Sequence, residues 1–103
     1  MRSHHYFVYI TTNKNKTTLY VGVTNDLPLR LQQHHDDALG LQKHFAGRYS
    51  CYHLVYYEYF QDIEEAIARE KQLKGWRRSK KEALIVSFNP QWRFLNEEVK
   101  ENL

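Results

Sequence analysis

Two short runs of β-branched and aromatic residues, separated by a polar segment, constrain the fold of this 103-residue chain most strongly. They are residues 6–11 (YFVYIT) and residues 18–24 (TLYVGVT). Residues of these types favour strands, and the intervening NKNK at residues 13–16 is typical of a turn, so the segment predicts a β-hairpin. A turn at the centre of NKNK places Tyr9 directly opposite Tyr20.

Side chains alternate between the two faces of a strand, so the predicted hairpin has two unlike faces. One face suits a hydrophobic core and carries Tyr6, Val8, Ile10, Leu19, Val21 and Val23. The other carries Phe7, Tyr9, Thr11, Thr18, Tyr20 and Gly22. Two tyrosines beside a glycine, flanked by threonines, form a surface suited to a polar group. We therefore expect this second face to hold something polar.

Size and composition indicate one ordinary globular domain. A chain of 103 residues supports one modest core, and 42% hydrophobic with 26% charged residues is typical of globular proteins. We expect a single domain over residues 1–103, with its core at about residues 6–95 and a polar, frayed C-terminal tail. The formal charge of +3 permits an anionic partner but does not require one.

Cysteine content and hydropathy bear on the compartment. The single cysteine, Cys51, cannot form an internal disulfide, which fits a reducing compartment. The sequence contains no recognisable secretory signal and no apolar run of about 18 residues, the length that a membrane span needs. The expected location is the cytoplasm, without membrane association.

Helices and a further strand are predicted downstream of the hairpin. The predicted elements are a helix over residues 27–38 capped by Asn25 and Asp26, a loop over 39–50, a strand over 52–60, a helix from the Gln61–Asp62 cap to about Lys74, and a helix over 79–87. The expected fold is α+β: a three-stranded, mainly antiparallel sheet flanked by helices. The third strand is apolar enough to be central.

Apolar stripes on these helices predict which sides pack against the sheet. The expected core residues are Leu27, Leu31 and Ala38 on the first helix, Ile63, Ala66, Ile67 and Leu73 on the second, and Ala83, Leu84 and Val86 on the third. Three polar residues interrupt these stripes: Arg30 and His34 on the first helix and Glu70 on the second. A charge in such a position is costly unless it is paired, hydrogen-bonded or bound to a metal.

Two interpretations of these polar residues stay open. Arg30 and Glu70 could form a salt bridge between the helices, and His34 could be a packed, hydrogen-bonded imidazole. Together with the tyrosine-lined sheet face, however, they supply a carboxylate, a guanidinium, an imidazole and two phenols. This inventory suits phosphoryl chemistry, because one carboxylate can hold Mg²⁺ when phosphate and water complete the coordination, and arginine matches phosphate oxygens.

The order of these residues resembles the GIY-YIG nuclease domain. The resemblance is carried by Tyr9, Tyr20-Val21-Gly22, Arg30, His34, Glu70 and Asn89, and by the phrases LYVGVTNDLPLRLQQH, LVYYE, AIAREKQLKGWRRSKK and NPQW. These phrases are similar to the small single-domain bacterial branch, which is related to the nuclease domain of the excinuclease C subunit. The resemblance covers about residues 6–95. Phe7 and Val8 stand where the first family motif has glycine and isoleucine.

The resemblance implies hydrolysis of a DNA phosphodiester by one active site that uses Mg²⁺ or Mn²⁺. Glu70 would bind the metal ion, and Arg30 would stabilise the charge on the phosphate. Tyr9 and Tyr20 would orient or deprotonate the attacking water, with the choice of base left open, and His34 would bind phosphate or assist the water. Gly22 and Asn89 would contact the substrate, although Asn89 could instead be structural.

Charge placement gives a second clue. Residues 66–82 contain seven basic residues against two acidic ones. Lys74, Arg77 and Arg78 are the candidates for contacting a phosphate backbone, and a solvated helix face is the alternative. Trp76 within this run could stack on a base or pack in the core.

Other sites and functions remain to be separated from this one. Glu58 could supply a second carboxylate or be a solvated strand residue, and the six histidines lack the spacing of a zinc site. The leading rival to a nuclease is a non-catalytic nucleic-acid-binding module, and a protein-interaction domain is a third possibility. A partner protein could supply sequence specificity to a domain of this size.

Overall fold

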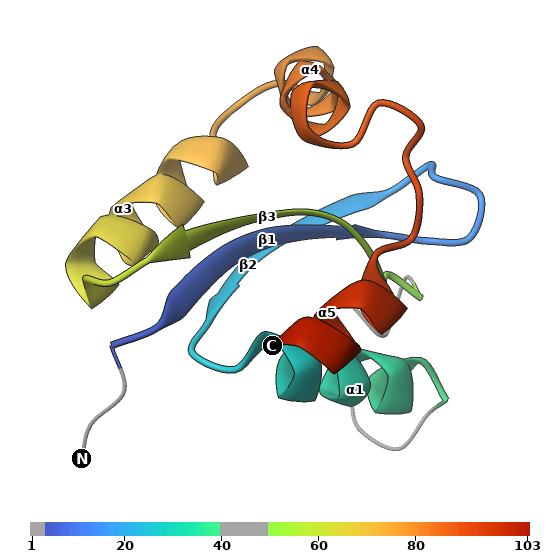
Figure 1. The fold of residues 1–103 in the computed structure, drawn as a ribbon. Coiled ribbons are helices and arrows are strands. Elements are labelled where there is room, and N and C mark those ends of the chain that lie inside the picture. The colour runs from blue at the N-terminus through green and yellow to red at the C-terminus, as the bar shows by residue number, and fades with distance from the viewer. Residues whose placement is uncertain (1–3, 40–49) are drawn as a thin grey trace.

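A computed structural model describes residues 4–39 and 50–103 of the chain. The elements are β1 (Tyr6–Thr12), β2 (Leu19–Thr24), α1 (Leu27–Ala38), β3 (His53–Phe60), α3 (Ile63–Lys74), α4 (Arg78–Phe88) and α5 (Asn96–Asn102). The three strands form one antiparallel sheet in the order β2-β1-β3. Helices α3 and α4 cover one face of the sheet, and α1 and α5 cover the other (Figure 1). The predicted α+β class is confirmed.

The predicted helices at residues 27–38 and 63–74 are confirmed with their caps. The Asp26 side chain accepts a hydrogen bond from the Leu29 amide, and Asp62 caps α3 in the same way. The loop expected over residues 39–50 falls mostly on residues 40–49, which lie outside the described part of the chain. Within the described residues, no helix has the length and apolar character needed to cross a membrane.

The connection of the β1–β2 hairpin begins with the predicted tight turn over residues 13–16, in which the Lys16 amide donates to the Asn13 carbonyl at 3.0 Å, and side chains close the rest of it. The Asn13 carboxamide oxygen accepts hydrogen bonds from the amides of Thr17 and Thr18, at 2.8 and 3.1 Å. The Thr12 hydroxyl donates to the Thr18 carbonyl at 2.8 Å. Lys16 takes the left-handed conformation, with φ at 60°. The connection therefore occupies residues 13–18. It is two residues longer than the predicted turn over residues 13–16, because Thr17 and Thr18 precede β2.

This longer connection shifts the strand register. Tyr9 lies opposite Gly22, and Tyr20 lies opposite Thr11, so the predicted pairing of Tyr9 with Tyr20 is wrong. The shift is two residues, which is one full period of a strand, and every side chain therefore keeps its predicted face. Tyr9, Tyr20 and Gly22 still share one face of the hairpin.

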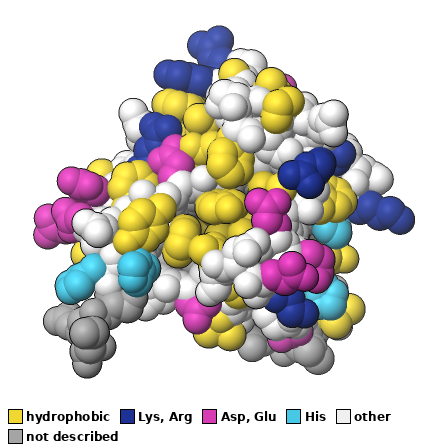
Figure 2. Space-filling model, in the orientation of Figure 1, with side chains coloured by type: hydrophobic (Ala, Val, Ile, Leu, Met, Phe, Trp, Pro, Cys, Tyr) yellow, Lys and Arg dark blue, Asp and Glu magenta, His cyan; other side chains and the backbone are white. Residues whose placement is uncertain are grey.

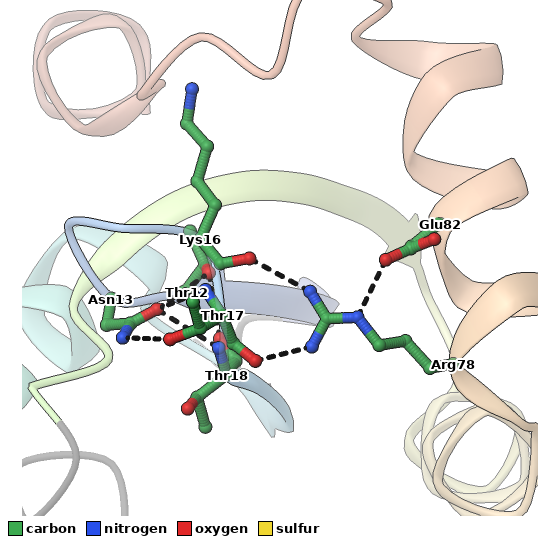
Figure 3. A network of polar contacts seen from close by, with 7 residues as sticks. All are labelled: Thr12, Asn13, Lys16, Thr17, Thr18, Arg78 and Glu82. Atoms are coloured by element: carbon green, nitrogen blue, oxygen red, sulfur yellow. Dashed lines mark hydrogen bonds and ion pairs between the residues drawn. The ribbon is translucent and has the colours of Figure 1, made fainter.

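Helix α4 holds the tip of the hairpin through one arginine (Figure 3). The Arg78 guanidinium donates to the carbonyls of Lys16 and Thr17, at 2.9 and 2.6 Å. It also forms an ion pair with Glu82 at 2.7 Å. The two hydrogen bonds to the hairpin join residues 61 and 62 positions apart in the sequence, and they fix the hairpin against the α3–α4 layer.

The central strand is β1, so the prediction that the third strand is central is wrong. β3 lies at an edge, and its apolar character has a different cause: helices cover the sheet on both faces. Leu54, Val55 and Tyr56 are buried accordingly. The start of this edge is also covered, because the Leu95 amide donates to the Leu54 carbonyl at 2.8 Å and the Asn96 side chain bonds the β3 backbone.

Each face of the sheet has its own hydrophobic core. The core under α3 and α4 contains Val8, Ile10, Val21, Val55, Tyr56, Ala66, Leu73 and Ile85. The core under α1 and α5 contains Phe7, Tyr9, Leu27, Leu31, Leu54, Leu95 and Val99. The hairpin face expected to hold a polar group is therefore partly a second core, with its two tyrosines among the leucines of α1.

The predicted apolar stripes of α3 and α4 are only partly buried. Ala66 and Leu73 are buried as expected, but Ile63 and Ile67 are 44% and 37% exposed. On α4, Ile85 is buried, whereas Val86 is 46% exposed. A three-stranded sheet is too narrow to cover a full stripe, so the outer residues stay in solvent. Figure 2 shows hydrophobic side chains at the surface of this side of the molecule.

The C-terminal segment is ordered, and the prediction of a frayed polar tail is wrong. α5 packs against α1, and its Val99, with Leu95 just before it, is buried. Two apolar residues four positions apart among polar ones are too short a pattern to predict a helix. The helix is stabilised by packing, which the sequence of the segment alone does not reveal.

Substitution of Asn89 tests how the segment that follows α4 is held against β3. Its buried amide group donates to the carbonyls of Val55 and Arg93 and accepts from the Arg93 amide. Asn89→Ala leaves these buried groups without partners and is expected to lower the free energy of unfolding by roughly 2–3 kcal/mol in urea denaturation. The control is Asn102→Ala, at an exposed position in α5, with an expected change of less than about 0.5 kcal/mol. Equal losses of stability in the two variants would contradict the structural role of the Asn89 hydrogen bonds.

Candidate active site

Three aromatic rings from three elements gather on the α1 side of the sheet. The ring centroids of Tyr9 and Tyr20 lie 6.4 Å apart, and that of His34 lies 5.7 and 5.3 Å from them. The Tyr9 hydroxyl and His34 Nε2 form a hydrogen bond of 2.8 Å between two fully buried side chains. The hairpin face that carries the tyrosines therefore contacts His34, one of the polar residues in the apolar stripe of α1.

Gly22 makes room for this arrangement. A Cβ atom at Gly22 would lie 2.5 Å from Cζ and 2.9 Å from Cε2 of Tyr9, closer than real contacts allow. The Tyr9 ring thus lies across the backbone of β2, where a side chain would stand in any other residue. This packing explains the glycine, and its predicted contact with a substrate stays a prediction.

Arg30 reaches the same place from one turn earlier in α1. It is half-buried, and its Nη1 donates to the Gln33 side chain at 3.0 Å. Burial lowers the pKa of Arg30, but its interactions with the Tyr9 and Tyr20 phenols act in the opposite direction and raise the pKa overall. The guanidinium therefore stays charged between two phenols.

The pKa of the Tyr9 phenol depends on burial and on several charged or titratable side chains. Burial raises the pKa of Tyr9 most, and the neighbouring Tyr20 adds to the effect. The charge and hydrogen bonding of Arg30 lower this pKa, and the negative charge of Glu70 raises it. The net result is a pKa well above the ordinary tyrosine value, so the Tyr9 phenol stays protonated near neutral pH.

Glu70 lies on α3, in the layer on the opposite face of the sheet from the three rings (Figure 1). Its side chain is 16% exposed, and its carboxylate forms an ion pair of 3.0 Å with Lys74. The alternative of a salt bridge with Arg30 is not seen among the described residues, where Lys74 is the ion-pair partner of Glu70. The charge of Glu70 is the smallest of the influences on the pKa of Tyr9, which it raises.

A basic hollow marks the open side of this cluster, at the edge strand β2. It has a volume of about 350 Å³ and is lined by Leu19, Tyr20, Val21, Lys74 and Lys81. Tyr20 thus connects the buried rings with a solvent-reached surface carrying two ammonium groups. Lys81 belongs to the basic run but was not singled out from the sequence, because only the fold brings α4 beside β2.

The residues of this candidate site fit a divalent cation that is held by one carboxylate together with water and substrate. Within the described residues, no group of three or more His, Cys, Asp or Glu side chains could hold a metal ion. Glu70 offers one carboxylate that solvent reaches. Mg²⁺ is commonly held by one or two carboxylates, with water and substrate phosphate filling the octahedron, so this donor set fits Mg²⁺ or Mn²⁺ together with a phosphate substrate.

The remaining candidate residues lie elsewhere. Arg78 fixes the hairpin tip, Arg77 is exposed at the start of α4, and the amide of Asn89 is taken up by backbone groups. None of these three is among the groups that act on Tyr9 or line the basic hollow. Their contacts with a substrate stay predictions, and for Asn89 the hydrogen bonds match its structural alternative.

The structure also gives the positions of Glu58 and Trp76, for which the sequence left two roles open. The Glu58 carboxylate accepts hydrogen bonds from Tyr56 and from Arg69, with an ion pair of 2.8 Å to Arg69. It lies on the α3 side of the sheet and is occupied there. Trp76 packs against the core on that side, with the cations of Arg69 and Lys80 at 5.3 and 4.3 Å from its ring.

The fold and the cluster agree with the comparison with known families. The model of the GIY-YIG catalytic domain matches residues 5–83. The chain therefore belongs to the GIY-YIG family, a family of nucleases, and the resemblance found in the sequence is confirmed.

Similar proteins carry the family designation UPF0213. A relative from Clostridium perfringens is 37% identical over 81 residues, which cover 79% of this chain and 83% of the relative. One from Bacillus pumilus is 29% identical over 101 residues, covering 98% and 99%. One from Haloquadratum walsbyi is 34% identical over 84 residues, covering 82% and 89%. No solved structure matches the chain significantly.

Substitution of Gly22 tests the packing of Tyr9. Gly22→Ala forces the Tyr9 ring away from β2 and is expected to lower the free energy of unfolding by about 1–3 kcal/mol. Gly75→Ala is the matched control, because its Cβ would lie 3.6 Å or more from the nearest atoms and its φ is −82°. That variant is expected to be neutral or slightly stabilising. Equal tolerance of both substitutions in thermal unfolding would contradict the close approach.

The raised pKa of Tyr9 predicts a dependence of stability on alkaline pH. Because the folded-state pKa exceeds the unfolded value of about 10, this contribution to stability is complete below that pH and decreases as the pH rises further. The free energy of unfolding should therefore fall less steeply between about pH 9 and 11 in Tyr9→Phe than in the wild type. Parallel pH profiles would show that Tyr9 titrates as an exposed phenol.

Proposed function

We propose that this protein is a divalent-metal-dependent endonuclease that hydrolyses DNA phosphodiester bonds through one active site. Family membership supports a nuclease. The observation that carries the proposal is the surroundings of the Tyr9 phenol, on which Tyr20, Arg30 and Glu70 all act while His34 bonds its hydroxyl. A carboxylate, a guanidinium and two phenols from four different elements have no common structural purpose at this place.

Burial divides the five residues into two groups. Tyr9 and His34 are fully buried and bonded to each other, which suits positioning residues. Tyr20, Arg30 and Glu70 are only partly buried, and Tyr20 lines the basic hollow. We therefore assign contact with the attacking water to Tyr20 and the orientation of the Tyr20 and Arg30 side chains to the Tyr9–His34 pair.

Arg30 would bind the phosphate that is cleaved. Its planar guanidinium suits phosphate oxygens, and a charge held beside the reaction stabilises negative charge as it develops in the transition state. In the net reaction one water is consumed: its oxygen ends on the phosphorus, the bond from phosphorus to the leaving sugar oxygen breaks, and that oxygen takes up a proton.

Glu70 would hold the Mg²⁺ or Mn²⁺ ion. Such an ion polarises a phosphoryl oxygen and stabilises the leaving oxygen. Lys74, which now pairs with Glu70, would be released by the stronger positive charge of the metal. Lys74 and Lys81 would then contact the phosphates on either side of the cleaved bond, in agreement with the lining of the hollow.

The same basic hollow would also serve a non-catalytic nucleic-acid-binding module, which is the second candidate function. The two differ in whether metal-dependent cleavage accompanies DNA binding. A protein partner that adds specificity and a location in the cytoplasm stay predictions of the sequence.

Glu70→Gln is the variant that tests the proposal. Wild-type protein with Mg²⁺ or Mn²⁺ is expected to cleave DNA substrates that include nicked, branched and single-stranded forms. Loss of the metal-binding carboxylate should reduce the rate by about a hundredfold or more, and chelation of the metal should abolish cleavage. Glu65→Gln, at an exposed position on the same helix, is the control and should retain full activity.

The outcomes separate the two functions. Cleavage that survives Glu70→Gln contradicts the assigned metal site. Salt-dependent DNA binding by the wild type without cleavage under any of these conditions favours the binding module.

A further inference from the structure

A row of aromatic rings lies beside the candidate active site and plays no part in it. We call it the ring ladder: His35 from α1, Tyr52 directly before β3, His53 at the start of β3, and Phe94 before α5. Successive ring centroids are 4.8, 4.3 and 4.1 Å apart. The last pair is stacked with 16° between the planes, whereas His35 meets Tyr52 edge-on at 84°.

The ring ladder lines a hollow of about 480 Å³. The other lining residues are Pro28, Leu31, Gln32, Asn96, Glu97 and Lys100. A volume near 500 Å³ lies within the ordinary range of small-ligand sites, and it is large enough for a nucleobase with its sugar. Phe94 is 40% exposed, so part of its ring surface is open to solvent.

Three lysines lie near the rings. Lys16, at the hairpin tip, places its ammonium group 5.3 Å from the centroid of the Phe94 ring. Lys100 lines the hollow, and Lys14 is close enough to influence the titration of His53. The lining itself contains one basic residue, Lys100, and one acidic residue, Glu97, so the excess of positive charge comes from Lys14 and Lys16 beside it. Burial, followed by the charges of His35 and Lys14, lowers the pKa of His53, so its ring is neutral near pH 7.

Planar rings next to lysines form the combination that binds unpaired nucleotides. Bases stack on aromatic side chains regardless of their identity, and nearby cations bind the phosphates. A paired base in a duplex does not offer its face in this way. A ligand that was merely anionic would not need the rings, and one that was merely aromatic would not need the lysines.

One helix connects the hollow to the candidate active site. Arg30 and His34 on α1 reach Tyr9, while Gln32 and His35 on the same helix line the hollow. A helix with its side chains is about 10–12 Å across, so the two places lie about one helix width apart. A few nucleotides of extended strand are enough to span this separation.

We propose that the ring ladder is a base-stacking subsite that holds an unpaired nucleotide of the substrate, a few nucleotides away from the phosphodiester that is cleaved. The assignment of the ligand to DNA rests on the proposed function. The subsite restricts the substrate class: DNA with an unpaired segment beside the cleavage point binds better than continuous duplex.

Phe94→Ala is the test variant, and its matched control is Phe88→Ala. Phe88 is 45% exposed and contacts two tyrosine rings, but it lies on the opposite side of the sheet, on α4. Phe94→Trp keeps a stacking surface at the test position. The probe is a short single-stranded oligonucleotide containing 2-aminopurine, whose fluorescence falls when the base stacks, and a fully paired duplex is measured in parallel.

Binding is measured in EDTA, so that cleavage does not contribute. Phe94→Ala is expected to weaken single-strand binding by about tenfold, with loss of 2-aminopurine quenching, and to leave duplex binding unchanged. Phe94→Trp and Phe88→Ala should bind as the wild type does. Circular dichroism verifies that each variant is folded, and if Phe94→Ala is unfolded, His53→Ala takes its place with the same expectation.

Several results would overturn the subsite. Unchanged single-strand binding in Phe94→Ala, an equal loss for duplex, or an equal loss in Phe88→Ala each contradict it. Competition by a free deoxynucleoside monophosphate at low micromolar concentration would instead indicate a mononucleotide site. Cleavage assays read the proposed function separately: a wild type that shows the Phe94 effect but never cuts DNA retains the subsite and loses the nuclease.

Discussion

The hydrogen bond between the Tyr9 hydroxyl and His34 Nε2 is the interaction on which the site depends. It joins the central strand to α1 in the middle of a hydrophobic core, where two polar groups without partners would be costly. It is possible only because Gly22 leaves space for the Tyr9 ring across β2. Strand, glycine and helix thereby set the positions of Arg30, one turn away on α1, and of Tyr20, on the neighbouring strand.

One residue of the proposed site, Glu70, lies on the other face of the sheet. Glu70 belongs to the α3 layer, yet its charge acts on Tyr9 because α3 packs across β1 and β2 beside the open edge of β2. Arg78 contributes at a distance by fixing the hairpin tip to α4. The basic hollow between β2 and these two helices therefore has a defined shape, with Tyr20 on one wall and Lys74 on another.

Much of this architecture could be predicted from the sequence, and the failures have physical causes. Strand periodicity gave the correct faces for Tyr9 and Tyr20, although the register was wrong because the Asn13 side chain closes a longer loop than local residue preferences indicate. The polar interruptions at Arg30 and His34 were visible from helical spacing. The position of α5, the edge location of β3 and the role of Arg78 depend on contacts between distant segments, which no local pattern encodes.

The central claim is that Glu70, Arg30 and the two phenols form one metal-dependent site, and a crystal structure with Mn²⁺ and an uncleavable DNA analogue tests it most directly. The account predicts anomalous density for the ion on the Glu70 carboxylate, with Lys74 displaced from it, and a phosphate oxygen between the ion and Arg30. Tyr20, and not Tyr9, should contact the water that faces this phosphate. An ion bound elsewhere, or a phosphate that leaves the Glu70–Lys74 pair intact, would contradict the account.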